Sequence, residues 1–169
     1  MDLNPIKQII PINFIGINDY PNLFLTLGMF IMISKKCKYA IKALLYLADH
    51  QSDDRSIFSS EIAEQEKIPK KFLETILREL RNFKLLQSQR GKTGGYRLIK
   101  DPKDIYLAEL IRQVDGPIAM LPCVSLNYYA SCEECEEESC QIKNVFEQVR
   151  DKTLNILTTT SIDSMRNQV

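Results

Sequence analysis

The sequence lacks an apolar run long enough to cross a membrane, and it has one histidine and no net charge. A transmembrane helix needs about 20 consecutive apolar residues, and the longest apolar stretch, Leu23 to Ile33, is far shorter. The N-terminal region also lacks a basic segment and a small-residue cleavage site, so it does not resemble a secretory signal. We therefore expect a cytoplasmic protein without a membrane partner, in which the five cysteines do not form a disulfide framework.

The first 31 residues are expected to be a leader outside the folded protein. They are apolar but interrupted by Pro5, Pro11 and Pro21. The segment Met32-Ile33-Ser34-Lys35-Lys36 is typical of a native N-terminus, which suggests that translation starts at Met32. The alternative is an apolar arm that docks on the domain.

The zero net charge conceals a strong asymmetry along the chain. Residues 34–100 contain 15 Lys and Arg against 8 Asp and Glu, whereas residues 101–169 contain 6 against 12. A basic half followed by an acidic half indicates two separate tasks. The basic half is the candidate for contact with nucleic acid.

The basic half has the pattern of a helix-turn-helix. Ser34 can cap a first helix that ends near Asp49, and Ser59 or Ser60 can cap a short second helix. A turn at Lys67-Ile68 then leads to a third helix, with Pro69 at its first position. Apolar residues at helical spacing are expected to face inward from this third helix: Phe72, Leu73, Ile76, Leu77 and Leu80.

A basic hairpin follows the third helix at once. Its strands are expected at Leu85-Leu86 and at Tyr96 to Ile99, with Gly94-Gly95 supplying the positive φ of the bend. Residues 32–116 are therefore predicted to form a winged helix-turn-helix domain, mainly α-helical with a small β-hairpin wing, whose partner is double-stranded DNA.

The candidate DNA-binding residues lie on the second helix, the third helix and the wing. Lysine and arginine side chains can neutralise phosphates, and Glu74 can accept a hydrogen bond from a cytosine amino group. Arg90, between glycines at the tip, can approach the backbone or the minor groove closely. The full set is Ser59, Ser60, Lys70, Lys71, Glu74, Arg78, Ser88, Arg90, Lys92 and Thr93.

The acidic half predicts a short helix, a loop and a long helix. A helix over Tyr106 to Val114 is stopped by Asp115-Gly116-Pro117, and residues 117–140 form a cysteine-rich acidic loop. Residues 141–160 form a helix, and residues 161–169 a tail. The apolar stripe of this helix is expected to pair with a second subunit, the alternative being packing on its own domain. The stripe comprises Ile142, Val145, Phe146, Val149, Ile156 and Leu157.

Two motifs resemble a known family. They are Ile68-Pro69-x-x-Phe72-Leu73-x-x-Ile76-Leu77-x-x-Leu80 and Leu85-Leu86-x-Ser88-x-Arg90-Gly91-x-x-Gly94-Gly95-Tyr96-x-Leu98. They are similar to the signature of the Rrf-two (Rrf2) family of bacterial transcriptional regulators, and the resemblance extends from Met32 to about Met165. It implies a homodimer that reads a near-palindromic operator, with repression as the expected mode. It also implies that Lys70, Lys71 and Glu74 lie in the recognition helix, that Arg90 is the wing-tip arginine, and that the helix from Gln141 is the dimerisation helix.

The loop holds four cysteines: Cys123, Cys132, Cys135 and Cys140. Three or four thiolates can bind an iron–sulfur cluster or a tetrahedral zinc ion, and two close thiols can form a redox disulfide. The resemblance implies three ligands ahead of the dimerisation helix, best matched by Cys123, Cys132 and Cys140. The gaps between them are wider than in the family's best-studied members, and Cys135 is an extra thiol that can be a fourth ligand, a replacement for Cys132, or a bystander. Free thiols without metal are the other alternative.

Two other functions fit the sequence less well. A thiol oxidoreductase using Cys132-x-x-Cys135 would need a βαβ surrounding and a nearby histidine, and neither is present in the sequence. A winged-helix module that binds only proteins would not need the cations Lys70, Lys71, Arg90 and Lys92. We therefore expect a DNA-binding regulator that is not an enzyme.

Overall fold

The computed structural model describes residues 33–50, 55–91, 94–132, 136 and 138–167. The proposed leader, Lys92, Thr93 and Cys135 therefore lie outside the described residues. The elements are α1 (Lys35–His50), α2 (Ser59–Gln65), α3 (Lys70–Asn82), β1 (Leu86–Gln89), β2 (Gly95–Leu98), η2 (Pro102–Asp104), α4 (Leu107–Val114), η3 (Pro122–Val124), α5 (Gln141–Thr159) and α6 (Ile162–Arg166).

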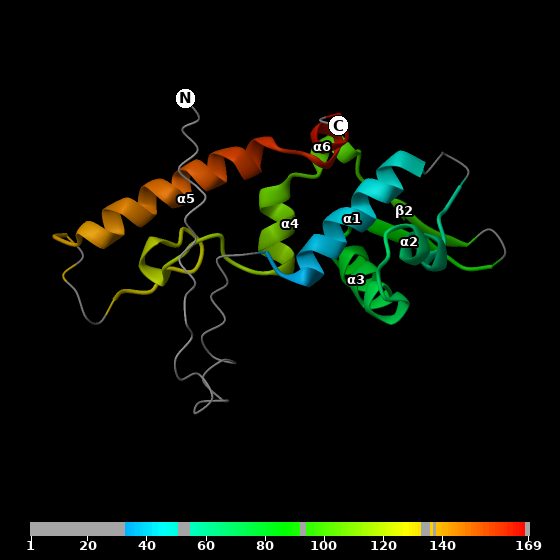
Figure 1. The fold of residues 1–169 in the computed structure, drawn as a ribbon, viewed down its shortest axis with the longest axis horizontal. Helices are drawn as coiled ribbons and strands as arrows, with labels where there is room; N and C mark the ends of the chain where they lie inside the picture. The colour runs from blue at the N-terminus through cyan, green and yellow to red at the C-terminus, as the bar shows by residue number, and fades with distance from the viewer. Residues whose placement is uncertain (1–32, 51–54, 92–93, 133–135, 137, 168–169) are drawn as a thin grey trace, which may run out of the picture.

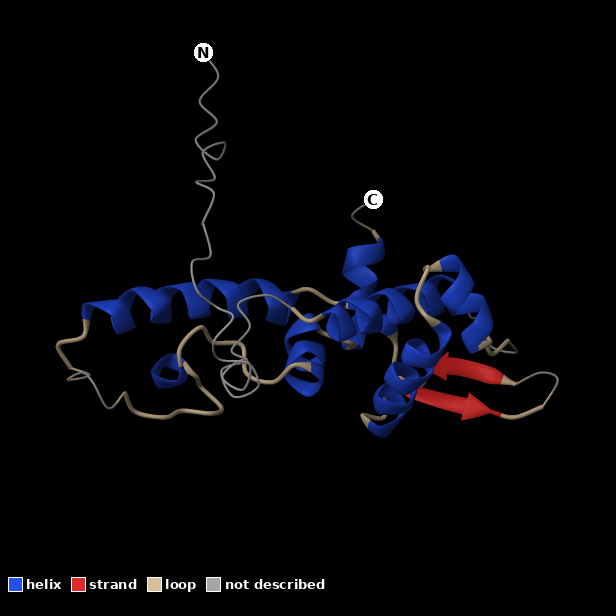
Figure 2. Cartoon of the chain, turned by 60° about the horizontal axis from the view of Figure 1, so that its bottom comes forward, coloured by secondary structure: helices blue, strands red, loops and turns tan. Residues whose placement is uncertain are grey.

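The first five elements form one packed unit around a buried apolar core. α1 lies across α2 and α3, and the β1–β2 hairpin extends from this helical layer (Figure 1). The strands are antiparallel, with Leu86 opposite Leu98 and Gln89 opposite Gly95. Figure 2 shows the two strands leading away from the helices, so the wing is held at its base, and Arg90 beyond the end of β1 is exposed. The predicted winged helix-turn-helix architecture is thus confirmed.

Both ends of α1 are formed as the sequence predicted. The Ser34 hydroxyl accepts a hydrogen bond from the Cys37 amide at 3.0 Å, which caps the helix. His50 lies in the last turn, where its ring stacks on Tyr46 with 4.1 Å between centroids. The Asp115 carboxylate accepts from the amide and hydroxyl of Ser34 at 2.8 and 2.6 Å, so the start of α1 is tied to the end of α4.

The prediction that Ser59 or Ser60 caps α2 is wrong. Phe58 occupies the N-cap position, and the amides of Glu61 and Ile62 donate to its carbonyl at 3.1 and 3.2 Å. The preceding residue, Ile57, forms an isolated antiparallel bridge with Tyr96. This bridge keeps the chain extended up to Phe58, and the helix begins directly afterwards with Ser59 inside its first turn.

Smaller differences concern the boundaries of α3 and of the wing. Pro69 is the N-cap of α3 and not its first helical residue, so the helix begins at Lys70, one residue later than predicted. β1 extends further toward the tip than Leu85-Leu86, because the pairing of Ser88 and Gln89 with β2 continues the ladder. The positive φ values fall at Gly91 and Gly95, and Gly94 is instead required because a Cβ there would lie 2.6 Å from the Gln89 carbonyl oxygen.

The main element of the C-terminal half is the long helix α5, which is attached to the rest of the chain at its C-terminal end. α5 extends away from the winged domain, and its C-terminal end lies beside α4 (Figure 1). The Leu107 amide donates to the Thr160 carbonyl at 3.0 Å, and the Ile162 amide donates to the Ile105 carbonyl at 2.9 Å. These bonds hold the C-terminal end of α5 against the N-terminal end of α4.

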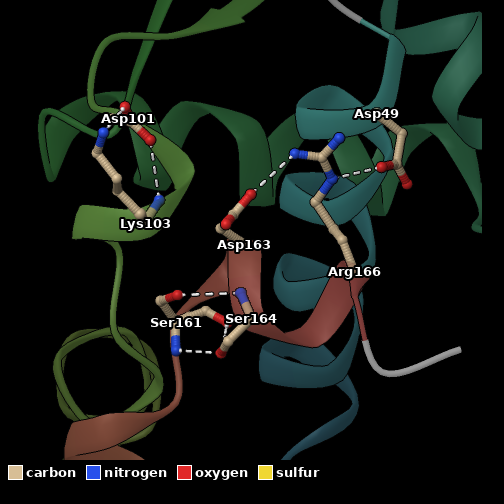
Figure 3. Close-up of polar contacts among 7 residues, drawn as sticks. All are labelled: Asp49, Asp101, Lys103, Ser161, Asp163, Ser164 and Arg166. Atoms are coloured by element: carbon tan, nitrogen blue, oxygen red, sulfur yellow. Dashed lines mark hydrogen bonds and ion pairs between the residues drawn. The ribbon is translucent and has the colours of Figure 1, made fainter.

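The predicted tail contains a helix, α6, that docks on α1 and η2. Ser161 and Ser164 form a reciprocal capping box at its start (Figure 3). Arg166 at its end donates to Asp49 of α1 and to Asp163, and Ile162 is fully buried. α6 thus joins the end of α5 to the helix that packs on α3. Within the described ranges, no helix is both long enough and apolar enough to cross a membrane.

Candidate DNA interface

The third helix presents one apolar face and one polar face. The apolar face is buried and consists of Leu73, Ile76, Leu77 and Leu80. On the opposite side, four exposed residues recur at spacings of four, three and four: Lys71, Thr75, Arg78 and Asn82. This face carries two cations and two uncharged polar groups and is exposed in the described part of the domain. It has the composition of a helix that enters a DNA groove.

The predicted recognition-helix residues divide between this face and its edge. Lys70, Lys71 and Arg78 are exposed, whereas Glu74 is only partly exposed. Of the two serines predicted on α2, Ser60 is exposed and Ser59 is partly exposed. Phe72 was expected in the core, but 38% of its surface is exposed, because it lies beside the buried stripe rather than in it.

The turn between α2 and α3 is fixed by backbone hydrogen bonds and one lysine. Lys67 adopts a positive φ of 53°, and the Ile68 amide reaches back to the Ala63 carbonyl at 2.9 Å. The Lys42 ammonium donates to the Glu66 carbonyl at 3.0 Å and pairs with the Glu66 carboxylate at 2.7 Å. A cation at the C-terminal end of α2 is stabilising. α1 therefore sets the position of the turn that orients α3.

The wing is coupled to α3 through Arg81. Its guanidinium donates to the hydroxyl of Ser88 on β1 at 3.3 Å. Near the tip, Gly91 has a φ of 104° and its carbonyl accepts from the Gly94 amide at 3.0 Å, so the chain turns tightly beside the exposed Arg90. The bond between Arg81 and Ser88 thus adds a side-chain link between α3 and the wing to the backbone bond from the Leu85 amide to the Leu80 carbonyl.

The cations of this surface differ in their partners from three cations that lie elsewhere in the domain. Lys36, Lys42 and Arg55 each pair with a glutamate, at 3.1, 2.7 and 2.7 Å respectively. Over the described part of the chain, no ion pair involves Lys70, Lys71, Arg78 or Arg90. Their charge is available to an anionic partner, and a polyphosphate backbone is the partner that many separated cations fit.

The structure does not gather the three described cysteines of the acidic loop. Cys123 lies on η3 and is partly buried, Cys132 is exposed, and Cys140 is the N-cap of α5, where its sulfur accepts from the Lys143 amide at 3.4 Å. Among the described residues, no group of three or more Cys, His, Asp or Glu side chains is close enough to hold a metal ion. The three thiols predicted as ligands are therefore dispersed along the loop in this conformation.

Cys37 differs chemically from the loop cysteines. Its side chain is fully buried in the core. Burial, together with the nearby Asp115 carboxylate, raises the pKa of its thiol to about 12. It therefore stays protonated near neutral pH and is not a metal ligand or a nucleophile in the folded protein.

The long helix α5 has no buried residue. Three members of the predicted dimerisation stripe are largely exposed, namely Ile142, Val145 and Ile156 at 62%, 58% and 63%. Phe146 and Val149 are partly exposed, and Leu157 packs against the core of its own domain. One edge of α5 is therefore exposed in the described chain, whereas Leu157 packs on its own domain, and the pairing of the stripe with a second subunit stays a prediction.

Sequence reasoning missed three groups of this surface. Thr75 lies at the centre of the outward face of α3, and Phe72 lies next to it. Arg81 links α3 to the wing. The signal for Thr75 was present, because the spacing from Lys71 and to Arg78 is helical. The hydrogen bond of Arg81 depends on the position of the wing and has no sequence signature.

Comparisons with known proteins agree with this architecture. The family model Rrf2, described as an iron-dependent transcriptional regulator, matches residues 33–168. A protein of Rhodobacter capsulatus, described as an rrf2-like HTH-type transcriptional regulator, is 43% identical over 137 residues, which are 79% of this chain and 91% of that protein. The HTH-type transcriptional regulator IscR of Photorhabdus laumondii is 29% identical over 136 residues, covering 80% of this chain and 79% of the relative.

Two solved structures are similar in fold. CymR, described as the global cysteine regulator of B. subtilis, matches with a TM-score of 0.69 at 24% identity, over 83% of this chain and 99% of that chain. IscR of T. potens matches with a TM-score of 0.64 at 25% identity, over 82% of this chain and 88% of that chain. Both likenesses extend beyond the winged domain into the C-terminal half.

Proposed function

The chain belongs to the Rrf2 family of helix-turn-helix transcriptional regulators, and from that premise we propose that it acts as a homodimeric, DNA-binding repressor. The observation that carries the proposal is the set of exposed cations without ion pairs in the described structure, on α3 and at the wing tip. Proteins of this family bind DNA, and this surface joins a groove-sized helix to a projecting hairpin.

We infer different tasks for the parts of this surface. The first turns of α3 enter the major groove, where Lys70 and Lys71 meet phosphates or base edges. Glu74, at the edge of the outward face, accepts a hydrogen bond from a cytosine amino group. Arg90 reaches the backbone or minor groove beside this site. Phosphate contacts position the protein, and base contacts give it sequence preference.

A dimer would place two such surfaces on one operator. The exposed edge of α5 supports this part of the proposal, because Ile142, Val145 and Ile156 form an apolar strip without a partner in the described chain. Half-sites read by paired helix-turn-helix units lie about one helical turn of DNA apart.

The salt dependence of binding tests the DNA proposal. The variant Lys70→Ala/Lys71→Ala/Arg90→Ala should bind duplex DNA more weakly than the unchanged protein. The slope of log affinity against log salt should become shallower by roughly 0.9 for each phosphate that the variant no longer neutralises. The measurement is a mobility-shift titration at several salt concentrations with a duplex selected from a random-sequence pool.

A matched variant removes the same charge elsewhere. Lys36→Ala/Arg55→Ala/Lys103→Ala removes three cations that pair with carboxylates, so its salt slope should be unchanged. Equal weakening in the two variants would mean that only net charge matters. An unchanged affinity in the first variant would place DNA binding on another surface, and a failure to bind any duplex would favour a protein-interaction module instead.

We also propose that the cysteine loop binds an iron–sulfur cluster, with zinc as the second metal candidate. The proposal is supported by the thiol donor set of Cys123, Cys132 and Cys140 and by the description of the family as iron-dependent. The dispersed thiols do not form a ready site in the described structure. The loop would therefore have to close around the cluster, and the thiols would have to lose their protons.

Metal analysis tests this second proposal. Protein purified without oxygen should contain iron and absorb visible light, and Cys132→Ala should lose most of both. Cys37→Ala removes a thiol outside the loop and should retain them. A colourless protein without iron or zinc would reject the metal proposal and leave the DNA proposal intact.

A further inference from the structure

Apolar atoms lie among the cations on the outward side of α3. Phe72 is 38% exposed and Thr75, three residues further on, is exposed beside Lys71 and Arg78. Residues separated by three positions are neighbours on a helix surface. Phe72 and Thr75 therefore form one small apolar step, in a place where solvent exposure alone would favour polar side chains.

The ring of Phe72 is held in place by Tyr39 of α1. The two rings meet edge to face, with 5.9 Å between centroids and 76° between planes. Such pairs are stabilising beyond simple burial. The exposed part of the Phe72 ring is thus a fixed wall of the apolar step rather than a freely rotating side chain.

The hydroxyl of Thr75 is turned toward its own helix. Its Oγ1 donates to the Lys71 carbonyl at 3.3 Å, one turn earlier. A threonine bound in this way has its hydroxyl engaged by the backbone. The methyl group is what remains for a partner beside the Phe72 ring.

The major groove displays one apolar group on its base edges, the 5-methyl group of thymine. We propose that the apolar step of Phe72 and Thr75 reads this methyl group and selects thymine at one position of each half-site. The inference rests on the proposed function, because it requires α3 to lie in the major groove. The flanking cations meet phosphates, which carry no sequence information directly, so the apolar step contributes specificity that they do not.

The test removes one methyl group at a time from each side of the contact. Duplexes are selected from a random-sequence pool, and each thymine of the half-site is then replaced by deoxyuridine, which lacks only the methyl group. The unchanged protein should bind one such duplex about fourfold more weakly, as expected for one buried methyl group. Thr75→Ser, which loses only the side-chain methyl group, should show a smaller difference between the thymine and uracil duplexes, because only the Phe72 ring is left to contact the thymine methyl group.

Thr75→Val is the matched control, because it keeps the methyl group and should keep the preference for thymine. All three proteins should show the same salt slope, since none of these changes alters a phosphate contact. Equal binding of every uracil duplex by the unchanged protein would overturn the inference, and so would an undiminished preference in Thr75→Ser. If selection recovers no duplex at all, the proposed DNA binding fails, and the inference fails with it.

Discussion

Replacing Val145 and Ile156 of α5 with glutamate is expected to give a folded monomer that binds duplex DNA at least about a hundredfold more weakly. Both side chains are more than half exposed on the edge of a helix that buries no residue within its own chain. Charges on that edge would repel each other across a dimer interface and would have to be desolvated there. Two linked sites gain between about a hundred- and ten-thousandfold in avidity over one, and a monomer forgoes that gain.

The measurement combines sedimentation with mobility-shift titration. Asn144→Glu/Asn155→Glu is the matched control, because it adds the same charge to the same helix at exposed positions on another side. It should remain dimeric and bind DNA nearly as the unchanged protein does. Circular dichroism and thermal melting should show both variants folded, since the winged domain has its own core. A Val145→Glu/Ile156→Glu variant that stayed dimeric would place the interface elsewhere.

The attachment of α5 to its own winged domain determines what dimerisation can do to α3. The Tyr106–Ser161 bridge and helix α6 fix the C-terminal end of α5 against α4 and α1. α1 in turn packs on α3. Near the middle of α5, Arg150 donates to the Val124 carbonyl at 2.7 Å, which holds the first part of the cysteine loop to the same helix. The pairing of two α5 helices would therefore set the separation of the two recognition helices.

The winged helix-turn-helix could be predicted because its signals are local. Apolar residues at helical spacing mark α3, and Ser34 marks the start of α1 through a cap that spans three residues. The basic residues between glycines predict the hairpin from its own sequence, and no contact with another element is needed. Each of these signals concerns residues that are neighbours in sequence, and the structure agrees with each to within a few residues.

The parts that sequence reasoning missed depend on contacts between distant segments. α6 has five residues and no amphipathic repeat that a sequence could reveal, and Ile162 becomes buried only when α1 and η2 are already in place. The start of α2 depends on the bridge between Ile57 and Tyr96, which are 39 positions apart. Phe72 matched the spacing of the core residues, but its neighbour Tyr39 covers only one side of the ring.

Gly95→Ala is expected to destabilise the winged domain by about 3 kcal/mol or more, the largest effect of the three wing glycines. Gly95 has a φ of 136°, and a Cβ there would lie 2.5 Å from the Ile57 carbonyl oxygen. A side chain in the positive-φ region costs about 1–3 kcal/mol by itself. The clash adds to this cost, because the bridge between Ile57 and Tyr96 joins the wing to the segment before α2 and cannot move away freely.

Substitutions at the neighbouring glycines separate the cost of a positive φ from the cost of the steric clash. Gly91→Ala keeps the positive φ of 104° but meets nothing within 4 Å, so it should cost only about 1 kcal/mol. Gly94→Ala meets the Gln89 carbonyl oxygen at 2.6 Å without a positive φ, and its cost should fall between the other two. Urea denaturation of the three variants measures the order directly, because the midpoint shifts with stability while the slope stays constant. If Gly91→Ala proved as costly as Gly95→Ala, backbone conformation alone would explain both, and the close approach of Ile57 would not be what requires glycine at the base of the wing.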